Sequence, residues 1–517
     1  MNDLVRIELQ PLGKTVTVEK GSPLWDVLFA QGVEFPCGGL GLCRGCRIKV
    51  LEGLLPATTD DLRLFSPAEI ARGWRLACQA KAEGDLKLEL AQWEAAILAD
   101  HSSIFDFTAR EGLGVAVDLG TTTVVAQLLD LQTGHVLGIR MALNEQAAHG
   151  ADVMSRVDLA LEGGGLVKLR DLIRGQLGRM IGELLGNAGD QAARLKDVVI
   201  VGNTVMHHLF CGLDVTPLSH SPFEPQDDGL HVFRAADLGW AWAALTRVCF
   251  LPCLGGFVGS DVLAGIMATR LHESKELGAL IDLGTNGEIV VGNRERMVCA
   301  STAAGPAFEG ARISVGMRAA TGAISEVTVN DGQFHCHVLG NAAPRGICGS
   351  GLVDAIAGGL DLGLIRPTGR LAQGDSLMVV PSISLTQNDI RELQLAKGAI
   401  AAGVRLLVRT WGAQMEDITK VYLAGAFGNY INRSSARRIG LLDFPLEKVE
   451  AAGNTALLGA KLALFKLPET GGAYPHLLER TRHICLHEHP QFQDIYVEEM
   501  QFPGKVSVGV TPSPTTA

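Results

Sequence analysis

The sequence predicts an α+β chain of several domains, in which a small β-rich domain precedes a two-part α/β region. Three observations lead to this prediction. The chain has 517 residues, which is more than one hydrophobic core normally organises. Four cysteines gather within residues 37–78, inside a stretch of alternating apolar and polar residues. A strand–turn–strand pattern then occurs twice further along the chain, which indicates two related halves.

Residues 1–92 are predicted to form the β-rich domain. Alternating apolar residues predict a hairpin, helical spacing predicts one helix, and two more strands follow, the last of which should close the sheet. The expected hairpin strands, helix and later strands are 5–9 with 15–18, 23–31, 46–51 and 85–90. This order resembles the β-grasp fold of ferredoxins.

Cys37, Cys43, Cys46 and Cys78 form the pattern Cys-x5-Cys-x2-Cys, followed after 31 residues by the fourth cysteine. Three thiolates on one short loop and a fourth on a distant strand make a cage suited to a [2Fe–2S] cluster. The loop is rich in glycine, which lets backbone N–H groups turn toward the sulfurs. A zinc site is the alternative, but structural zinc favours two Cys-x2-Cys pairs, and Cys78 stands apart. We therefore expect all four cysteines to be metal ligands.

The rest of the chain is predicted to have four parts. Residues 93–111 show no periodicity of their own and are interpreted as a linker. The two halves of the α/β region are assigned to 112–275 and 276–505. Residues 506–517 are rich in Pro, Ser and Thr, and this composition predicts a disordered tail.

The repeated unit is a buried strand, an Asp-Leu-Gly-Thr turn and a second strand, found at 115–129 and again at 279–291. Glycine permits a tight turn and a close approach of backbone N–H groups to an anion, and threonine hydroxyls add donors. A carboxylate at the strand end can hold a metal-bound water or orient a nucleophilic one. The candidate catalytic residues are Asp118 and Asp282, and the candidate phosphate-binding residues are Gly120, Thr121, Thr122, Gly284, Thr285 and Asn286.

Two such turns resemble the paired phosphate loops of the actin, sugar kinase and Hsp70 superfamily. The resemblance implies two lobes that close over ATP·Mg, with Asp118 and Asp282 facing each other across the phosphates. Residues 421–429 read as an apolar strand running into a glycine-rich turn, which resembles the adenosine-binding loop of that superfamily and adds Gly425 and Gly428. The alternative interpretation of the repeated Asp-Leu-Gly-Thr unit is two unrelated β-hairpins. Helical spacing follows each copy of the unit, at 151–161 and 166–185 and at 390–410 and 454–464.

Composition and charge exclude several functions. The net charge is −11 and no run of Lys or Arg is present, so nucleic acid is not an expected partner. No window of about 18 uncharged apolar residues predicts a membrane span. The N-terminus lacks the basic and apolar regions of a signal peptide. Eleven cysteines in such a chain favour a reducing, cytoplasmic environment, with those outside the cage serving mainly as small apolar residues.

The order of further motifs carries a more specific resemblance. GNTVMHH, IDLGTNGEI, AAGPAFEG, ICGSGL and AGAFGNY follow the cysteine domain one after another. Together they resemble the reductive activators of corrinoid-dependent enzymes, over roughly residues 1–505. The resemblance implies an iron–sulfur enzyme that uses ATP to reduce cob(II)alamin to cob(I)alamin on a corrinoid protein or methyltransferase. Its implied cofactors are a [2Fe–2S] cluster, ATP and Mg²⁺, and an upstream donor must load the cluster.

Two other functions stay open from the sequence. One is ATP-dependent electron donation to a different low-potential acceptor, and the other is a redox-sensing scaffold with a degenerate nucleotide site. Both aspartates and all the loop glycines are present, which argues against degeneration. A homodimer is neither indicated nor excluded.

Several further segments are interpreted one by one. The surface around 202–208 and 303–310 is expected to contact the corrinoid protein. At least one of His207 and His208 is interpreted as a core residue at a helix start, with ligation of a corrinoid cobalt or another metal as the alternative. Residues 346–351 are interpreted as a small-residue loop. Cys485 stands alone near the C-terminus, so the C-terminal cysteine sets of [4Fe–4S]-containing members are missing. Residues 487–489 (His-Glu-His) are interpreted as adjacent solvated side chains, with metal binding as the alternative.

Overall fold

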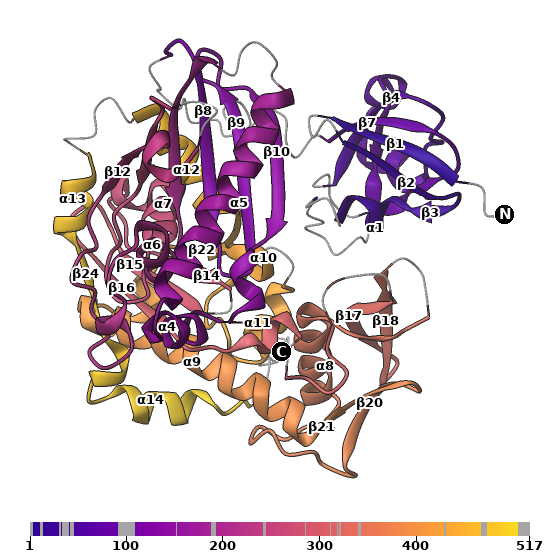
Figure 1. Ribbon diagram of the computed structural model, residues 1–517. Coiled ribbons are helices and arrows are strands. Elements are labelled where there is room, and N and C mark those ends of the chain that lie inside the picture. The colour runs from indigo at the N-terminus through magenta and orange to yellow at the C-terminus, as the bar shows by residue number, and fades with distance from the viewer. Residues whose placement is uncertain are drawn as a thin grey trace, which may run out of the picture.

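The computed structural model organises the chain around three main sheets (Figure 1). No helix of the described residues is long and apolar enough to cross a membrane. The structure describes residues 4–10, 14–29, 33, 41, 46–90, 109–150, 152–187, 193–240, 244–284, 286–310, 312–317, 319, 322–339, 343–428, 431–466 and 473–504. Most of the expected linker and the whole expected tail at 506–517 lie outside these ranges.

The N-terminal sheet has the order β2-β1-β7-β4-β5. The predicted hairpin is confirmed, because β1 pairs antiparallel with β2. The strand predicted at 85–90 is present as β7, which lies in the centre of this sheet, parallel to β1 and antiparallel to β4. The elements are β1 Leu4–Gln10, β2 Lys14–Glu19, β3 Ser22–Pro23, α1 Leu24–Phe29, β4 Arg47–Glu52, α2 Thr59–Leu64, α3 Pro67–Ala71, β5 Trp74–Leu76, β6 Lys81–Ala82 and β7 Leu86–Leu90.

The second sheet has the order β10-β9-β8-β11-β13-β12. Its first three strands form an antiparallel meander, after which β11 returns parallel to β8 and β13 parallel to β11. The long helix α5 packs on β9 and β10. The elements are β8 Leu113–Leu119, β9 Thr123–Asp130, β10 Val136–Leu143, α4 Val153–Leu161, α5 Gly165–Asn187, β11 Leu195–Val201, α6 Thr204–Cys211, β12 His231–Arg234, β13 Arg247–Phe250 and α7 Ser260–Thr269.

The third sheet repeats this arrangement in the order β16-β15-β14-β22-β23, with β24 added beside β16. β14, β15 and β16 form the meander, and β22 runs parallel to β14. The helix α9 packs on β15 and β16, as α5 does on β9 and β10. The strands are β14 Gly278–Leu283, β15 Gly287–Gly292, β16 Met297–Thr302, β22 Lys420–Ala424, β23 Val449–Gly453 and β24 Thr481–His483. The internal repeat is therefore one of topology as well as sequence.

Helices of this second half begin and end at residues with clear signals. The helix α9 starts with a capping box, since the Thr386 side chain accepts from the Asp389 N–H, and it ends where Gly412 takes a left-handed backbone. The helix predicted at 390–410 is thus present with wider bounds, and the one predicted at 454–464 begins one residue later and ends two residues later. The helices are α8 Gly349–Asp361, α9 Gln387–Trp411, α10 Gly425–Gly428, α11 Arg433–Arg438, α12 Thr455–Lys466, α13 Ala473–Arg480 and α14 Phe492–Glu499.

Between β16 and α9 the chain forms small β structures that periodicity did not predict. β17 pairs with β18 and with β19, and β20 pairs with β21. The expected loop at 346–351 is wrong in its second half, because α8 begins at Gly349 with Cys348 as its N-cap residue. The strands are β17 Ala323–Asn330, β18 Gln333–Val338, β19 Gly346–Ile347, β20 Ser376–Val380 and β21 Ile383–Thr386.

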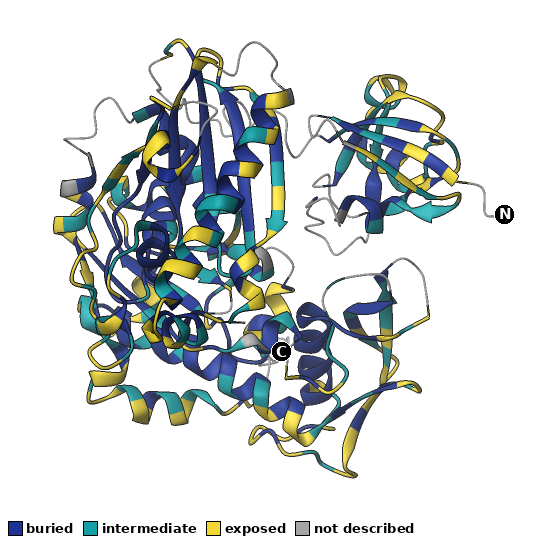
Figure 2. Ribbon diagram, in the orientation of Figure 1, coloured by how far each residue is buried: buried dark blue, intermediate teal, exposed yellow. Residues whose placement is uncertain are grey.

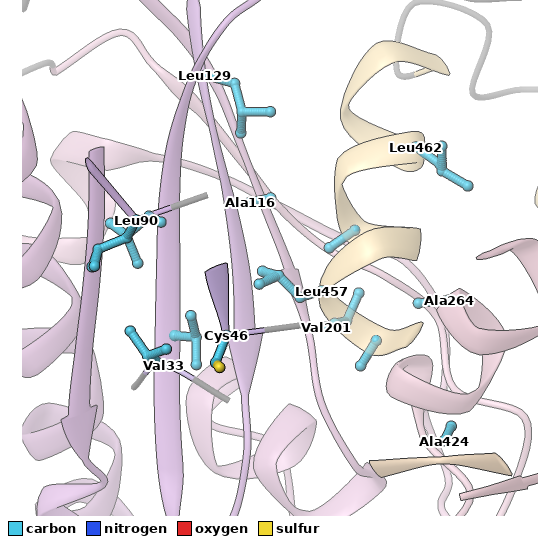
Figure 3. Packing of buried hydrophobic residues seen from close by; sticks show 14 of the residues in the cluster. Val33, Cys46, Leu90, Ala116, Leu129, Val201, Ala264, Ala424, Leu457 and Leu462 are labelled. Carbon is cyan, nitrogen blue, oxygen red and sulfur yellow. The ribbon is translucent and has the colours of Figure 1, made fainter. Parts of the chain in front are cut away.

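Two helices from distant parts of the chain join the two large sheets. α12 packs on β8 and β11 of the second sheet, α7 packs on β14 of the third, and α7 and α12 pack on each other. Figure 3 shows Leu457 and Leu462 of α12 together with Ala264 of α7 and Val201 of β11. A Cβ at Gly459 would lie 2.1 Å from the Ala264 carbonyl oxygen, so this crossing requires glycine. The burial view in Figure 2 shows the central strands of both sheets, such as β8 and β14, as mostly buried.

We expect Gly459→Ala to lower the free energy of unfolding by about 1–3 kcal/mol, because the new methyl group must push the two helices apart. Calorimetry of the purified chain would measure this change. Gly186→Ala on α5 is the matched control, since nothing lies within 4 Å of its added Cβ. The control should be neutral or raise stability by up to about 1 kcal/mol. Equal destabilisation by both variants would contradict a tight crossing.

Candidate functional site

Asp118 and Asp282 occupy equivalent places on the two large sheets. Every residue of β8 and β14 is buried except these two, which are half-buried near the carboxyl end of each strand. Asp118 is paired with Val201 of the neighbouring parallel strand, and Asp282 is paired with Ala424 in the same way. Ligands of α/β sheets bind outside the carboxyl ends of parallel strands. The repeat thus presents one carboxyl group from each sheet at a ligand-binding edge.

The turns after the two aspartates are each closed by a backbone hydrogen bond from the glycine, which spans three residues in the first turn and two in the second. The Gly120 N–H donates to the Thr123 carbonyl oxygen at 3.0 Å, and the Gly284 N–H donates to the Asn286 carbonyl oxygen at 3.0 Å. A Cβ at Gly120 would lie 2.6 Å from the Thr123 oxygen, which explains the glycine there. The expected ligand Thr285 lies outside the described residues.

Three polar side chains hold the first turn in place. Asn203 donates from Nδ2 to the Thr121 hydroxyl oxygen at 2.8 Å, and Arg156 donates to the Thr121 carbonyl oxygen at 2.6 Å. Asn144 donates to the Gly120 carbonyl oxygen at 3.0 Å, and its backbone N–H donates to the Thr122 carbonyl oxygen at 2.9 Å. These contacts engage the carbonyl oxygens of Gly120, Thr121 and Thr122 and fix the path of the turn.

Arg156 and Asn203 were not predicted as site residues. Arg156 is fully buried, and burial lowers the pKa of its guanidinium to about 10. It lies 35 residues beyond the loop that it supports, so no local pattern could reveal the contact. Asn203 had a signal, because it follows the strand end in GNTVMHH and is the N-cap residue of α6. Segment 202–203 therefore belongs to this site rather than to an outer surface.

His207 and His208 of the same motif are buried in the core. His207 is 0% exposed, packs edge-on against Phe250, and has its pKa lowered to about 3 by burial and by the neighbouring histidines. His208 Nδ1 lies 2.8 Å from the Thr204 carbonyl oxygen, one helical turn earlier. Both are thus core residues, where at least one was expected to be, and both are excluded from the expected contact surface.

Gly425 lies directly against the second aspartate. It has a left-handed backbone with φ of +82°, and a Cβ there would lie 2.4 Å from Asp282 Oδ1. Gly428 has no comparable constraint, because a Cβ there would meet only ordinary contacts. Phe427 stacks on Phe308 at 4.6 Å between ring centroids. The glycine-rich turn thus contacts the small-residue segment at 303–310, which sequence analysis singled out separately.

Four carboxyl groups interact electrostatically at the carboxyl edge of the two sheets. Burial raises the pKa of Asp118 to about 6, and burial together with the Asp118 charge raises the pKa of Asp282 to about 7. Burial and then the charge of Asp282 raise the pKa of Asp261 to about 7. Glu288 has a pKa well above its usual value for the same reasons, with Asp261 and Asp282 as the charged neighbours. Such a group of acids is suited to a divalent cation, which removes their mutual repulsion.

Asp261 and Glu288 were missed as site residues. Glu288 lies inside the motif IDLGTNGEI, so the sequence already places it next to the loop. Only the fold shows that the charge of Asp282 acts on Glu288. Asp261 lies in the first turn of α7, where the Asp261 and Ser260 N–H groups approach the Gly202 carbonyl oxygen. Its proximity to the two aspartates is a product of tertiary structure alone.

Asn454 connects the first aspartate to the second half of the chain. Its Nδ2 donates to Asp118 Oδ2 at 3.0 Å, while its side-chain oxygen accepts from the Leu457 N–H at the start of α12. The ionised form of Asp118 is favoured by this hydrogen bond, although burial has the larger effect on its pKa. The contact spans 336 residues of sequence and joins the catalytic candidate to the helix pair α7–α12.

Two of the four predicted cluster cysteines can be placed. Cys46 is buried immediately before β4, and Cys78 lies in the 3-10 turn Ala77–Gln79 after β5 rather than on a strand as expected. The Ala77 N–H donates to the Cys46 carbonyl oxygen at 3.1 Å, which fixes the two cysteine segments at one end of the β4–β5 pair. The turn ends the strand alternation and leaves Cys78 beside the Cys46 loop. Cys37 and Cys43 lie outside the described residues.

Comparison with protein families gives three matches along the chain. Residues 7–83 match a 2Fe-2S iron-sulfur cluster binding domain. Residues 113–274 match the RACo middle region, called the middle segment below, and residues 276–509 match the C-terminal domain of RACo, the ASKHA domain, called the C-terminal segment below. Fold class and cluster domain are therefore as predicted.

Similar individual proteins agree with these matches. The chain is 38% identical to "Corrinoid activation enzyme RamQ" of Eubacterium limosum over 427 residues, which are 76% of this chain and 71% of that one. It is 28% identical to "[Co(II) methylated amine-specific corrinoid protein] reductase" of Methanosarcina barkeri, covering 68% and 70%. The solved structure "Reductive activator for corrinoid,iron-sulfur protein" shares 27% identity and a TM-score of 0.66, covering 97% of this chain and 98% of that one.

The raised carboxyl pKa values predict an unusual stability profile. A carboxyl whose pKa is raised on folding favours the folded state while protonated, so its contribution is lost as pH rises toward and through about 7. Without nucleotide or divalent cations, Asp282→Asn should therefore be more stable than the wild type at pH 8, by about 1–2 kcal/mol, and its advantage should shrink at pH 6.

Thermal unfolding in the presence of a chelator, at pH 6 and pH 8, measures this effect. Asp443→Asn is the matched control, because Asp443 is exposed and should show no such gain. A less stable Asp282→Asn protein at pH 8 would contradict the proposed repulsion among the four carboxyl groups.

Proposed function

The chain belongs to the RACo family of reductive activators of corrinoid proteins, and we propose that it uses ATP to drive the one-electron reduction of a Co(II) corrinoid to Co(I) on a partner corrinoid protein. The observation that carries this proposal is the combination, in one chain, of the cysteine domain and the duplicated Asp-containing loops, together with similarity to corrinoid activators over most of its length.

We propose that Cys37, Cys43, Cys46 and Cys78 hold the [2Fe–2S] cluster, which supplies one electron at a time. The described part of the cage fits this group, since Cys46 and Cys78 are brought together at one end of a strand pair. Residues 93–111 would connect this domain to two lobes at 112–275 and 276–505. An upstream electron donor must reload the cage after each transfer.

ATP·Mg would be bound between the two repeated loops. Backbone N–H groups at Thr121 and Thr122, and at Thr285 and Asn286, would contact phosphate oxygens, while Gly120 and Gly284 would close the two turns and let the phosphates approach the backbone. Gly425 and Gly428 would border the adenosine. Asp118 and Asp282 would hold the metal-bound water or orient the attacking one, and Asp261 and Glu288 would add negative charge that favours Mg²⁺. Proton release from these carboxyl groups should accompany cation binding.

Nucleotide binding can supply the energy that the electron transfer lacks. An uphill one-electron transfer costs about 2.3 kcal/mol per 100 mV. Coupling between two binding sites is commonly worth about 1–3 kcal/mol. A protein that holds the partner differently with and without ATP can therefore shift the cobalt equilibrium by a useful amount. Asn454 is placed for this coupling, because it links Asp118 of the middle segment to α12 of the C-terminal segment.

We expect ATP·Mg to make reduction of the corrinoid visible. Purified protein with a reduced cluster, mixed anaerobically with a Co(II) corrinoid protein, should produce the Co(I) absorbance band with ATP·Mg and little without it. Asp118→Asn should lose the ATP-dependent part of the signal. A band of equal size without ATP, or none with the cluster reduced and ATP bound, would contradict the proposal and favour another electron acceptor.

Cluster and nucleotide should be separable by mutation. Cys43→Ser should abolish or strongly alter the visible absorption of the cluster while ATP binding, followed by calorimetry, stays within about twofold, because the two sites lie in separately matched segments. Cys336→Ser is the control, because Cys336 lies on β18 outside the cage and its substitution should preserve the absorption. Loss of ATP affinity in Cys43→Ser would contradict the modular arrangement.

A further inference from the structure

Three potential metal ligands converge near the end of the described chain, away from the cysteine cage. Cys485, His487 and Glu488 each offer one ligand atom, and these atoms all lie within 4.8 Å of one another. They belong to the short 3-10 turn Leu486–Glu488 and its N-cap residue, which follow β24 directly. Residues three apart eclipse in a 3-10 turn, which brings Cys485 and Glu488 to the same side. The sequence predicts solvated side chains for this His-Glu-His run, with metal binding as the alternative, but it does not predict Cys485 as a neighbouring ligand.

The distances between these atoms suit a tetrahedral ion. Cys485 Sγ lies 3.3 Å from His487 Nδ1. Two ligands at zinc–sulfur and zinc–nitrogen distances of about 2.3 and 2.0 Å lie about 3.6 Å apart at a tetrahedral angle. A thiolate, an imidazole and a carboxylate are a borderline-soft set that favours Zn²⁺ over Mg²⁺ or Ca²⁺. Cys485 is partly buried, and the other two residues are exposed, so an ion from solution can reach them.

Ser221 orients two of the three ligands. Its hydroxyl donates to Glu488 Oε1 at 2.8 Å and lies 3.3 Å from His487 Nε2, the ring nitrogen opposite Nδ1. Ligating histidines commonly hydrogen-bond through their second nitrogen, and ligating carboxylates are hydrogen-bonded as well. The thiol sulfur lies 3.3 Å from Nδ1 and 3.6 Å from Nε2, so it sits beside the imidazole ring, and the ring would turn when an ion binds.

We propose that Cys485, His487 and Glu488 bind a Zn²⁺ ion, with Ser221 as the supporting hydrogen-bond partner and a fourth position open to water. None of these residues belongs to the proposed cluster cage or to the nucleotide loops, so the proposal does not depend on the proposed function. The chemistry requires only loss of the Cys485 thiol proton to solvent when the ion binds, and no redox step.

The zinc site would join two parts of the chain. Ser221 belongs to the middle segment, whereas the three ligands belong to the C-terminal segment. Contacts between the same stretches surround the site: His483 Nδ1 lies 2.6 Å from Glu224 Oε1, and Phe223 packs edge-on against His487 at 5.1 Å between ring centroids. Cys485 Sγ lies 3.5 Å from the Pro222 carbonyl oxygen. A bound ion would fix the turn at 485–488, which forms one side of these contacts between the two segments.

Metal analysis of the full chain tests the proposal. The cluster-loaded protein is dialysed to equilibrium against micromolar Zn²⁺, and zinc and iron per chain are measured by mass spectrometry. We expect close to one zinc per chain in the wild type and at least a tenfold lower affinity in Cys485→Ala and in His487→Gln. His489→Gln is the matched control and should retain the zinc, because His489 is a partly buried histidine outside the ligand set.

Zinc K-edge absorption spectroscopy identifies the ligands directly, and iron does not interfere with it. We expect one sulfur at about 2.3 Å and nitrogen or oxygen ligands at about 2.0–2.2 Å. Zinc binding that is equal in the wild type and Cys485→Ala, or a spectrum without a sulfur ligand, would overturn the proposal. The iron content shows whether zinc has entered an unloaded cysteine cage, which would give several sulfur ligands and persist in both variants.

Discussion

The repulsion among four carboxyl groups at the ends of the central strands is the constraint on which the rest of the structure depends. Asp118 and Asp282 hold the same position in two sheets of the same topology, and Asp261 and Glu288 increase the local negative charge. Keeping such acids close together lowers stability, so the fold holds them by rigid means: buried strands, a buried arginine, and a glycine that admits Asp282 at close range. A bound cation would neutralise the repulsion among the carboxyl groups. The free energy that this repulsion costs the folded protein would then contribute to the affinity for the cation.

The same constraint explains why the two halves are joined so tightly. α7 carries Asp261, α12 begins next to Asn454, and these helices cross where Gly459 meets the Ala264 carbonyl. A change in charge at the carboxyl groups therefore acts on the helix pair between the sheets, because both helices are connected to these groups. Packed interfaces shift between discrete arrangements rather than deforming smoothly, so nucleotide binding has a direct mechanical route to the relative position of the two halves.

Local patterns predicted what depends on local physics. The hairpins, the long helices, the repeated turn and the cysteine spacing were all visible, because alternation, helical periodicity and glycine placement act over a few residues. What was missed depends on contacts across the fold. Arg156 reaches back 35 residues, Asn454 reaches Asp118 across 336, and the distant Ser221 contacts His487 and Glu488 beside Cys485. The position of Cys78 beyond its strand was a boundary error of the usual kind.

The nucleotide loops and the proposed zinc turn both connect the middle and C-terminal segments. Asn454 and Asp118 join them at one place, and Ser221 with Glu488 joins them at another. Two ligands that restrain one relative motion must influence each other's affinity by the same factor, whichever binds first. If both contacts move when the halves close, zinc occupancy sets how much of the binding energy of ATP is spent on closing them. When zinc already holds this turn in place, closing the two halves costs less conformational entropy. More of the ATP-binding energy is then available to change the affinity for the partner corrinoid protein.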